Sequence, residues 1–157
     1  MVEEKDKEKN ERLVIKDRVH LPYTWTFGKC ATRFFQEFRD HKKIWGTRCS
    51  ACAKVTVPPY SYCARCFAEC REWVEVKDEG VLMNFVVNLL DYPGQPMKPP
   101  YIVAQIRLDG ADTEFTHLIG EAEPASLRVG IRVKAVWQEE RSGILTDIKY
   151  FRPVEET

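Results

Sequence analysis

Four cysteines in two short pairs constrain this chain more than any other feature of its sequence. The pairs are Cys49-Ser-Ala-Cys52 and Cys63-Ala-Arg-Cys66, and ten residues separate them. Each C-x-x-C pair can aim two thiolates at one ion, and two pairs complete a tetrahedral four-sulfur shell. Such a shell suits zinc or iron, and zinc is favoured because the chain has no redox partner motif. We therefore predict a zinc ribbon over residues 47–70, with Cys49, Cys52, Cys63 and Cys66 as the metal ligands.

A shell of four thiolates leaves no open coordination position, so the ion is expected to stabilise the fold and to do no chemistry. The alternative is a pair of disulfides. It is disfavoured because the N-terminal sequence lacks the apolar stretch of a signal peptide. Cys30 and Cys70 are interpreted as ordinary reduced thiols. Competition between Cys70 and Cys66 for the metal stays open as an alternative.

The balance of charge argues against a general nucleic-acid-binding protein. Lys+Arg and Asp+Glu both number 24, so the formal net charge is zero. Proteins that bind nucleic acid through its phosphates usually carry a basic excess. No apolar run approaches the roughly 18 residues of a membrane span. The expected location is a reducing cytoplasm, where thiols stay free to bind metal.

The region before the ribbon divides in two. Residues 1–19 are rich in charges of both signs and are expected to form a disordered tail. Residues 20–46 are predicted to contain an amphipathic helix over 30–45, with Gly46 as its C-terminal cap. The apolar stripe of this helix either packs on the chain's own ribbon or docks on a partner subunit, because large apolar patches rarely stay exposed. The candidate partner-interface residues are Phe34, Phe35, Phe38 and Trp45.

After the ribbon, residues 71–157 show the pattern of a β-sheet protein. Turn signals separate candidate strands at 72–77, 81–90, 101–108, 113–120, 131–138 and 144–151. Short strands in about 80 residues fit a closed five-stranded barrel of the OB type. The predicted fold is therefore mainly β: an N-terminal helical segment and a zinc ribbon, followed by an OB-fold barrel.

No catalytic motif accompanies these elements. The chain contains neither a glycine-rich phosphate loop nor a G-x-S-x-G elbow, and its three histidines are scattered. With four cysteines assigned to metal, the sequence argues against an autonomous enzyme. An alternative is a single-stranded nucleic-acid-binding module, because OB faces stack bases on aromatic side chains. The aromatic residues considered for stacking are Phe85, Tyr101, Phe115 and Trp137.

Taken in order, these motifs closely resemble the DUF35 family of acyl-CoA-associated OB-fold proteins with a rubredoxin-like zinc ribbon. The resemblance covers residues 20–154. It rests on Gly46-Thr47-Arg48-Cys49-Ser50-Ala51-Cys52, Val57-Pro58-Pro59, the second cysteine pair, Pro100-Tyr101-Ile102-Val103-Ala104-Gln105-Ile106-Arg107-Leu108-Asp109-Gly110, Leu127-Arg128-Val129-Gly130-Ile131-Arg132-Val133 and Tyr150-Phe151-Arg152-Pro153.

The resemblance implies a non-catalytic small subunit of a hetero-oligomer with a thiolase-superfamily enzyme, with a hot-dog-fold hydratase as the alternative partner. Such a subunit shapes the acyl-CoA channel, while the large subunit carries the catalytic residues. CoA needs cations for its phosphates and apolar walls for its arm. We expect the ribbon–barrel junction to supply both, from Arg48, Lys54, Lys98, Tyr60, Tyr92 and Tyr101. Tyr60 departs from the family pattern, in which a basic residue often follows Pro-Pro.

Overall fold

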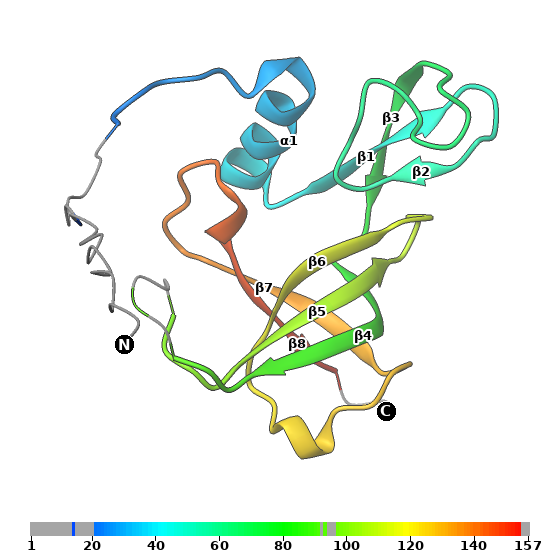
Figure 1. The fold of residues 1–157 in the computed structure, drawn as a ribbon. Coiled ribbons are helices and arrows are strands. Elements are labelled where there is room, and N and C mark those ends of the chain that lie inside the picture. The colour runs from blue at the N-terminus through cyan, green and yellow to red at the C-terminus, as the bar shows by residue number, and fades with distance from the viewer. Residues whose placement is uncertain (1–13, 15–20, 92, 94–96, 155–157) are drawn as a thin grey trace, which may run out of the picture.

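The computed structural model describes residues 14, 21–91, 93 and 97–154. The predicted tail, residues 1–19, falls outside this part of the chain except for Val14. Figure 1 shows helix α1 above a closed barrel, with a small sheet beside α1. No helix within the described residues is long and apolar enough to cross a membrane.

Helix α1 (Gly28–His41) ends four residues earlier than the helical pattern suggested. Lys42 adopts the left-handed conformation at its C-terminus, and its N–H donates to the carbonyl of Glu37. The prediction of Gly46 as the helix cap is wrong, because Gly46 lies inside a strand. A Cβ at this position would stand 2.7 Å from the backbone oxygen of Thr56. Glycine is needed here for close approach of two strands, not for ending a helix.

Three antiparallel strands build the ribbon sheet in the order β2-β1-β3. They are β1 (Ile44–Cys49), β2 (Val55–Thr56) and β3 (Cys70–Val76). The sequence pattern placed 72–77 in the barrel domain, yet β3 pairs with β1 over nearly its whole length. The sheet of the ribbon therefore runs from residue 44 to residue 76 and is larger than the predicted 47–70.

The remaining strands close into the predicted barrel, in the order β4-β5-β6-β8-β7. Strand β4 pairs with both β5 and β7, and β6 meets β8 in parallel, which is the strand arrangement of an OB fold. The predicted strand at 144–151 starts only at residue 148, because a short 3₁₀ helix, η2 (Leu145–Asp147), precedes it. The barrel strands are β4 (Glu79–Asn88), β5 (Tyr101–Leu108), β6 (Glu114–Ile119), β7 (Arg132–Trp137) and β8 (Ile148–Pro153), and a second 3₁₀ helix, η1 (Pro124–Ser126), precedes β7.

One hydrophobic core joins helix, ribbon and barrel. Phe38 from α1, Val57 from the ribbon and Phe151 from β8 are all fully or almost fully buried in it. Side chains of the β5–β6 turn also hold the ribbon. Asp112 accepts the N–H of Val55 at 2.8 Å, and the hydroxyl of Thr113 accepts the N–H of Val57 at 2.8 Å. These contacts fix the ribbon at one end of the barrel.

Candidate metal centre and ligand-binding surface

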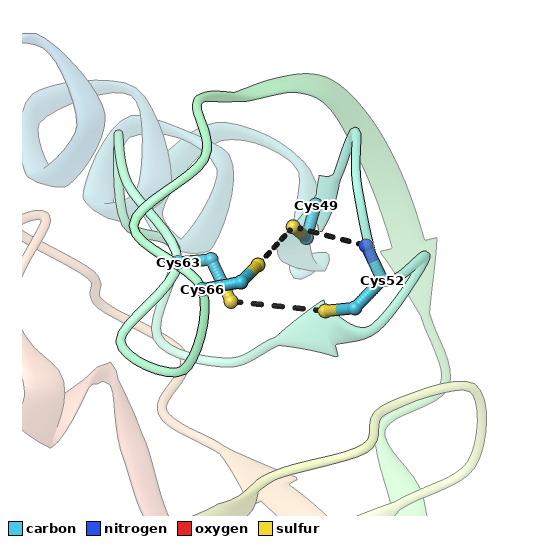
Figure 2. Close-up of side chains that lie close together, drawn as sticks. All are labelled: Cys49, Cys52, Cys63 and Cys66. Atoms are coloured by element: carbon cyan, nitrogen blue, oxygen red, sulfur yellow. Dashed lines mark hydrogen bonds between the residues drawn. The ribbon is translucent and has the colours of Figure 1, made fainter.

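The four predicted metal ligands come together in the ribbon. Their sulfur atoms all lie within 4.8 Å of one another, and Figure 2 shows them converging from two loops. The Sγ atoms of Cys49 and Cys66 are 3.3 Å apart, and those of Cys52 and Cys63 are 3.8 Å apart. A tetrahedral ion with metal–sulfur bonds of about 2.3 Å requires sulfur–sulfur edges of roughly 3.8 Å. The cluster therefore has the size and donor set of a four-thiolate metal centre.

The same backbone turn presents both pairs of cysteines. In the first turn, the N–H of Ala53 donates to the carbonyl of Cys49 at 3.0 Å. In the second, the N–H of Phe67 donates to the carbonyl of Cys63 at 2.9 Å. Ala53 and Phe67 each follow the second cysteine of a pair, and their φ angles are +58° and +57°. This repeated geometry explains why the C-x-x-C spacing alone predicted the centre.

Hydrogen bonds and charge separate the acidities of the four thiols. The N–H groups of Cys52 and Ala51, each 3.4 Å from the sulfur, stabilise the thiolate of Cys49 and lower its pKa to about 6. The N–H of Ala68 acts to lower the pKa of Cys66. The side-chain interactions of Cys66 with Cys49 and Cys63 outweigh this effect and raise the pKa of Cys66 to about 12. Four crowded thiolates repel one another, so a cation is needed to hold them all ionised. The arrangement thus fits a divalent metal.

The two other cysteines stand outside this group of four. Cys70 is buried and packs against Cys49 and Cys63, and burial is the main reason that its pKa is raised. The Sγ of Cys30 lies 3.1 Å from the hydroxyl of Ser61, which links α1 to the ribbon. All six cysteines are free thiols, so no disulfide forms.

The structure separates the residues expected to contact CoA. Arg48 belongs to β1 and pairs with Glu72 at 3.1 Å, while Lys54 and Tyr60 are exposed on the ribbon. Strand β5 begins at Tyr101 and ends at Leu108, just before the turn whose side chains contact the ribbon. Lys98 and Tyr101 therefore lie at the end of the barrel that is away from the ribbon. Eight residues of strand at about 3.3 Å each put these ends roughly 23 Å apart. The five of these residues that the structure describes therefore do not form one site at the ribbon–barrel junction, and Tyr92 is outside the described residues.

A hollow of about 290 Å³ opens on the outer face of the barrel, towards the Tyr101 end. The strand register places Val86 opposite Val103, two pairs from the Asn88–Tyr101 pair. A side-chain hydrogen bond between Asn88 and Tyr101 closes that end of the hairpin. The hollow is lined by Asn84, Phe85, Val86, Val103, Ala104, Gln105 and Thr116. Sequence reasoning missed it, because β4 carries a bulge between Leu82 and Asn84 that a simple alternation does not reveal.

Most of the expected partner-contact residues are used inside the chain. Phe34 and Phe38 are 2% and 0% exposed, which leaves them no surface for a partner. Phe35 is half-buried and packs on Phe27, with ring centroids 5.4 Å apart. The guanidinium of Arg33 lies over Trp45, which is also half-buried. Packing within the chain, the other interpretation of this stripe, accounts for these contacts.

Two of the aromatic side chains considered for base stacking are also unavailable. Phe115 is 2% exposed and lies inside the barrel. Trp137 is half-buried and packs edge-on against Phe38, with ring centroids 5.3 Å apart. Tyr101 is half-buried, and Phe85, also half-buried, pairs with buried Ala104 and packs against the core. The barrel therefore does not present all four of these aromatic residues as stacking platforms.

Comparisons with known proteins agree with this architecture. Residues 73–138 match the model of the C-terminal OB-fold domain of ChsH2. The solved structure "Ltp2-ChsH2(DUF35) aldolase" contains a chain that is 21% identical, with a TM-score of 0.60; the match covers 83% of this chain and 98% of that one. A DUF35-family protein of unknown function from Sulfolobus solfataricus is 25% identical, with a TM-score of 0.59, and covers 80% of this chain and 84% of its own. No curated protein matches in a sequence comparison.

The four-cysteine ribbon and the closed barrel define a protein of the ribbon-plus-OB class, whose barrel domain matches that of ChsH2. Within that class, its fold is similar to that of a DUF35-family protein, the family that its sequence motifs resemble.

Proposed function

We propose that this chain is a non-catalytic, zinc-binding accessory subunit of an acyl-CoA enzyme complex, working in a reducing cytoplasm. Its partner would be a thiolase-superfamily catalytic subunit, which it scaffolds while shaping the acyl-CoA channel. The observation that carries the proposal is the match of its barrel domain to ChsH2, together with the likeness to a chain named as part of an Ltp2–ChsH2 aldolase. The finer assignment, the small subunit of benzoylsuccinyl-CoA thiolase, rests on sequence resemblance alone.

The chemistry of the described residues supports an accessory role. The most acidic thiol, Cys49, belongs to the four-sulfur cluster and would be held by metal. His117 is buried in the barrel, stacked on Phe115, with its Nε2 3.3 Å from the carbonyl of Leu145. A covalent mechanism needs an accessible nucleophile beside a base, and neither group is placed for that. Catalysis is therefore assigned to the partner.

The metal of the ribbon would be zinc, held by Cys49, Cys52, Cys63 and Cys66. Four thiolates at tetrahedral distances saturate the ion, so it would order the two loops of the ribbon. Binding of such an ion is coupled to folding of its site. Zinc would therefore contribute to the complex by keeping the ribbon in the shape that the partner meets.

Acyl-CoA would lie along the outer face of β4 and β5. The hollow there is partly apolar and suits a thin pantetheine arm, and Lys98 follows in the loop at the open end with an exposed side chain. Val86, Leu89 and Leu90 are 61%, 71% and 76% exposed around this end. An apolar surface of this kind is typical of a site that a ligand or partner covers.

The position of the ligand is tested by kinetics on the intact complex. Lys98→Ala is expected to raise the KM for acyl-CoA about tenfold, because a hydrogen bond to a charged group contributes about 1.5 kcal/mol. Lys54→Ala removes an exposed lysine at the other end of the barrel and is the matched control, with KM unchanged. An effect of Lys54→Ala alone would move the ligand to the ribbon. No effect of either variant would assign the cations to the partner.

A further inference from the structure

The second cysteine loop carries an unusually exposed aromatic residue. Phe67 follows Cys66 and is 81% exposed, the most exposed of the large apolar side chains in the described residues. Its φ angle of +57° is a conformation that glycine adopts easily and bulky residues rarely. The chain thus places a large apolar side chain in water at a position where glycine would be more stable. Strain of this kind concentrates at functional sites.

Hydrogen bonds hold the backbone around Phe67 in place. The N–H of Phe67 donates to Cys63, and the N–H of Cys63 donates to the carbonyl of Ala68 at 2.8 Å. Further back, Tyr60 is fixed through both of its backbone groups by the buried hydroxyl of Thr47, at 3.0 and 2.8 Å. A backbone that is already fixed loses little conformational entropy when a partner binds the loop.

Two more exposed aromatic residues lie on the same loop. Tyr60 and Tyr62 are 56% and 63% exposed. Single exposed apolar residues are common on protein surfaces, but three aromatic residues within eight positions are the composition of an interface centre. We call residues 60–67 the aromatic loop. In Figure 1 the ribbon that carries it lies above the barrel, beside α1.

The charge around the aromatic loop indicates the chemistry of its partner. Arg65 within the loop is exposed, and its side chain makes no ion pair with an acidic group in the described part of the chain. Arg71, close by, pairs with Glu69 at 2.5 Å. A protruding apolar side chain with an unpaired cation beside it fits an apolar pocket with an acidic rim.

We propose that the aromatic loop is the docking site for the catalytic subunit, with Phe67 inserted into an apolar pocket of that protein and Arg65 facing its acidic rim. This inference rests on the proposed function and adds the surface through which the two chains meet. Nucleic acid is the less favoured occupant, because the chain has no net positive charge.

The test uses Phe67→Gly in the full-length, zinc-loaded chain. The catalytic subunit is first identified by mass spectrometry of the native complex and then purified, and its affinity for each variant is measured by titration calorimetry. Loss of a central aromatic side chain is expected to weaken binding tenfold or more. The melting temperature should stay equal or rise, because glycine relieves the backbone strain. A purely structural role for Phe67 would instead lower it.

Ala53→Gly is the matched control, because Ala53 occupies the equivalent position of the first cysteine turn with the same φ. Ala53→Gly should likewise keep or raise the melting temperature, and it should leave the affinity for the catalytic subunit unchanged. Phe67→Leu keeps an apolar side chain and should retain most of the binding. Arg65→Ala should slow association mainly at low salt.

Three outcomes would overturn the assignment. If the wild-type chain binds the catalytic subunit and Phe67→Gly binds it with the same affinity, the docking site is refuted and the proposed function still stands. Failure of the wild-type chain to bind any thiolase-superfamily subunit would refute the proposed function and the docking site together. Binding of a single-stranded oligonucleotide, or self-association, that Phe67→Gly abolishes would assign the loop to nucleic acid or to a second copy of the chain.

Discussion

Cys63 is 3% exposed and supplies one of the four sulfur atoms of the metal centre. Cys63→Ser removes a thiolate, so the variant should lose its stoichiometric zinc and unfold the ribbon, since binding and folding of such sites are coupled. Metal content by mass spectrometry and the thermal melt measure the two effects. Cys30→Ser, at a thiol outside the cluster, should be nearly silent. Full zinc and an unchanged melt in Cys63→Ser would refute the ligand assignment.

His117 makes the stability of the barrel depend on pH. Burial lowers the pKa of His117 below its ordinary value of 6.5, so the unfolded chain takes up a proton more readily than the folded chain. The stabilising contribution is then complete above about pH 6.5 and is lost as the pH falls from there through the folded pKa. The slope is at most about 1.4 kcal/mol per pH unit for one group.

The variant His117→Gln tests this origin of the pH dependence. Its side-chain amide can still donate to the carbonyl of Leu145, but it does not titrate. Chemical denaturation at pH 7.5 and pH 5.5 should show a smaller loss of unfolding free energy in the variant than in the wild type. Equal losses in both proteins would mean that other groups cause the effect.

At the scale of elements, α1 is predicted to be held mainly by Phe38. This side chain is fully buried between Phe34 and Trp137, with ring centroids 4.5 and 5.3 Å away. Phe38→Ala should cost about 3–5 kcal/mol, which lowers the melting temperature on the order of 10 °C in a chain of this length. Phe27→Ala, at a half-exposed ring, should cost much less. Similar losses in both would show that α1 is not anchored through its buried face.

Elements differ in how far their sequence determines them. The cysteine centre was predictable because a C-x-x-C pair is a local turn whose geometry does not depend on the rest of the fold. The end of α1 was not, because Trp45 matches both the helical stripe and strand β1, and pairing with β3 decides between them. The alternating pattern of residues 72–77 likewise fits a ribbon strand and a barrel strand equally well.

At the scale of the whole molecule, the barrel was predictable and the relative positions of the candidate CoA-binding residues were not. Alternating strands and turn signals indicate a small barrel. They do not indicate in which direction each strand runs, and this direction decides at which end of the barrel a residue lies. Lys98 and Arg48 are therefore separated by the length of β5, although both had been expected at one junction. Phe67 could have been noticed, because the residue after the second cysteine of each pair takes a conformation that favours glycine.

Reconstitution with the catalytic subunit from the native complex tests the central claim most directly. Turnover of an acyl-CoA substrate is measured for this chain alone, for the partner alone and for the two together, with their association followed by sedimentation. The isolated chain should show no thiolase, aldolase or hydratase activity, because its described residues place no free nucleophile beside a base. The two chains should form a stable hetero-oligomer whose turnover exceeds that of the partner alone. Robust turnover by this chain in the verified absence of the partner, or no complex at all, would contradict an accessory role.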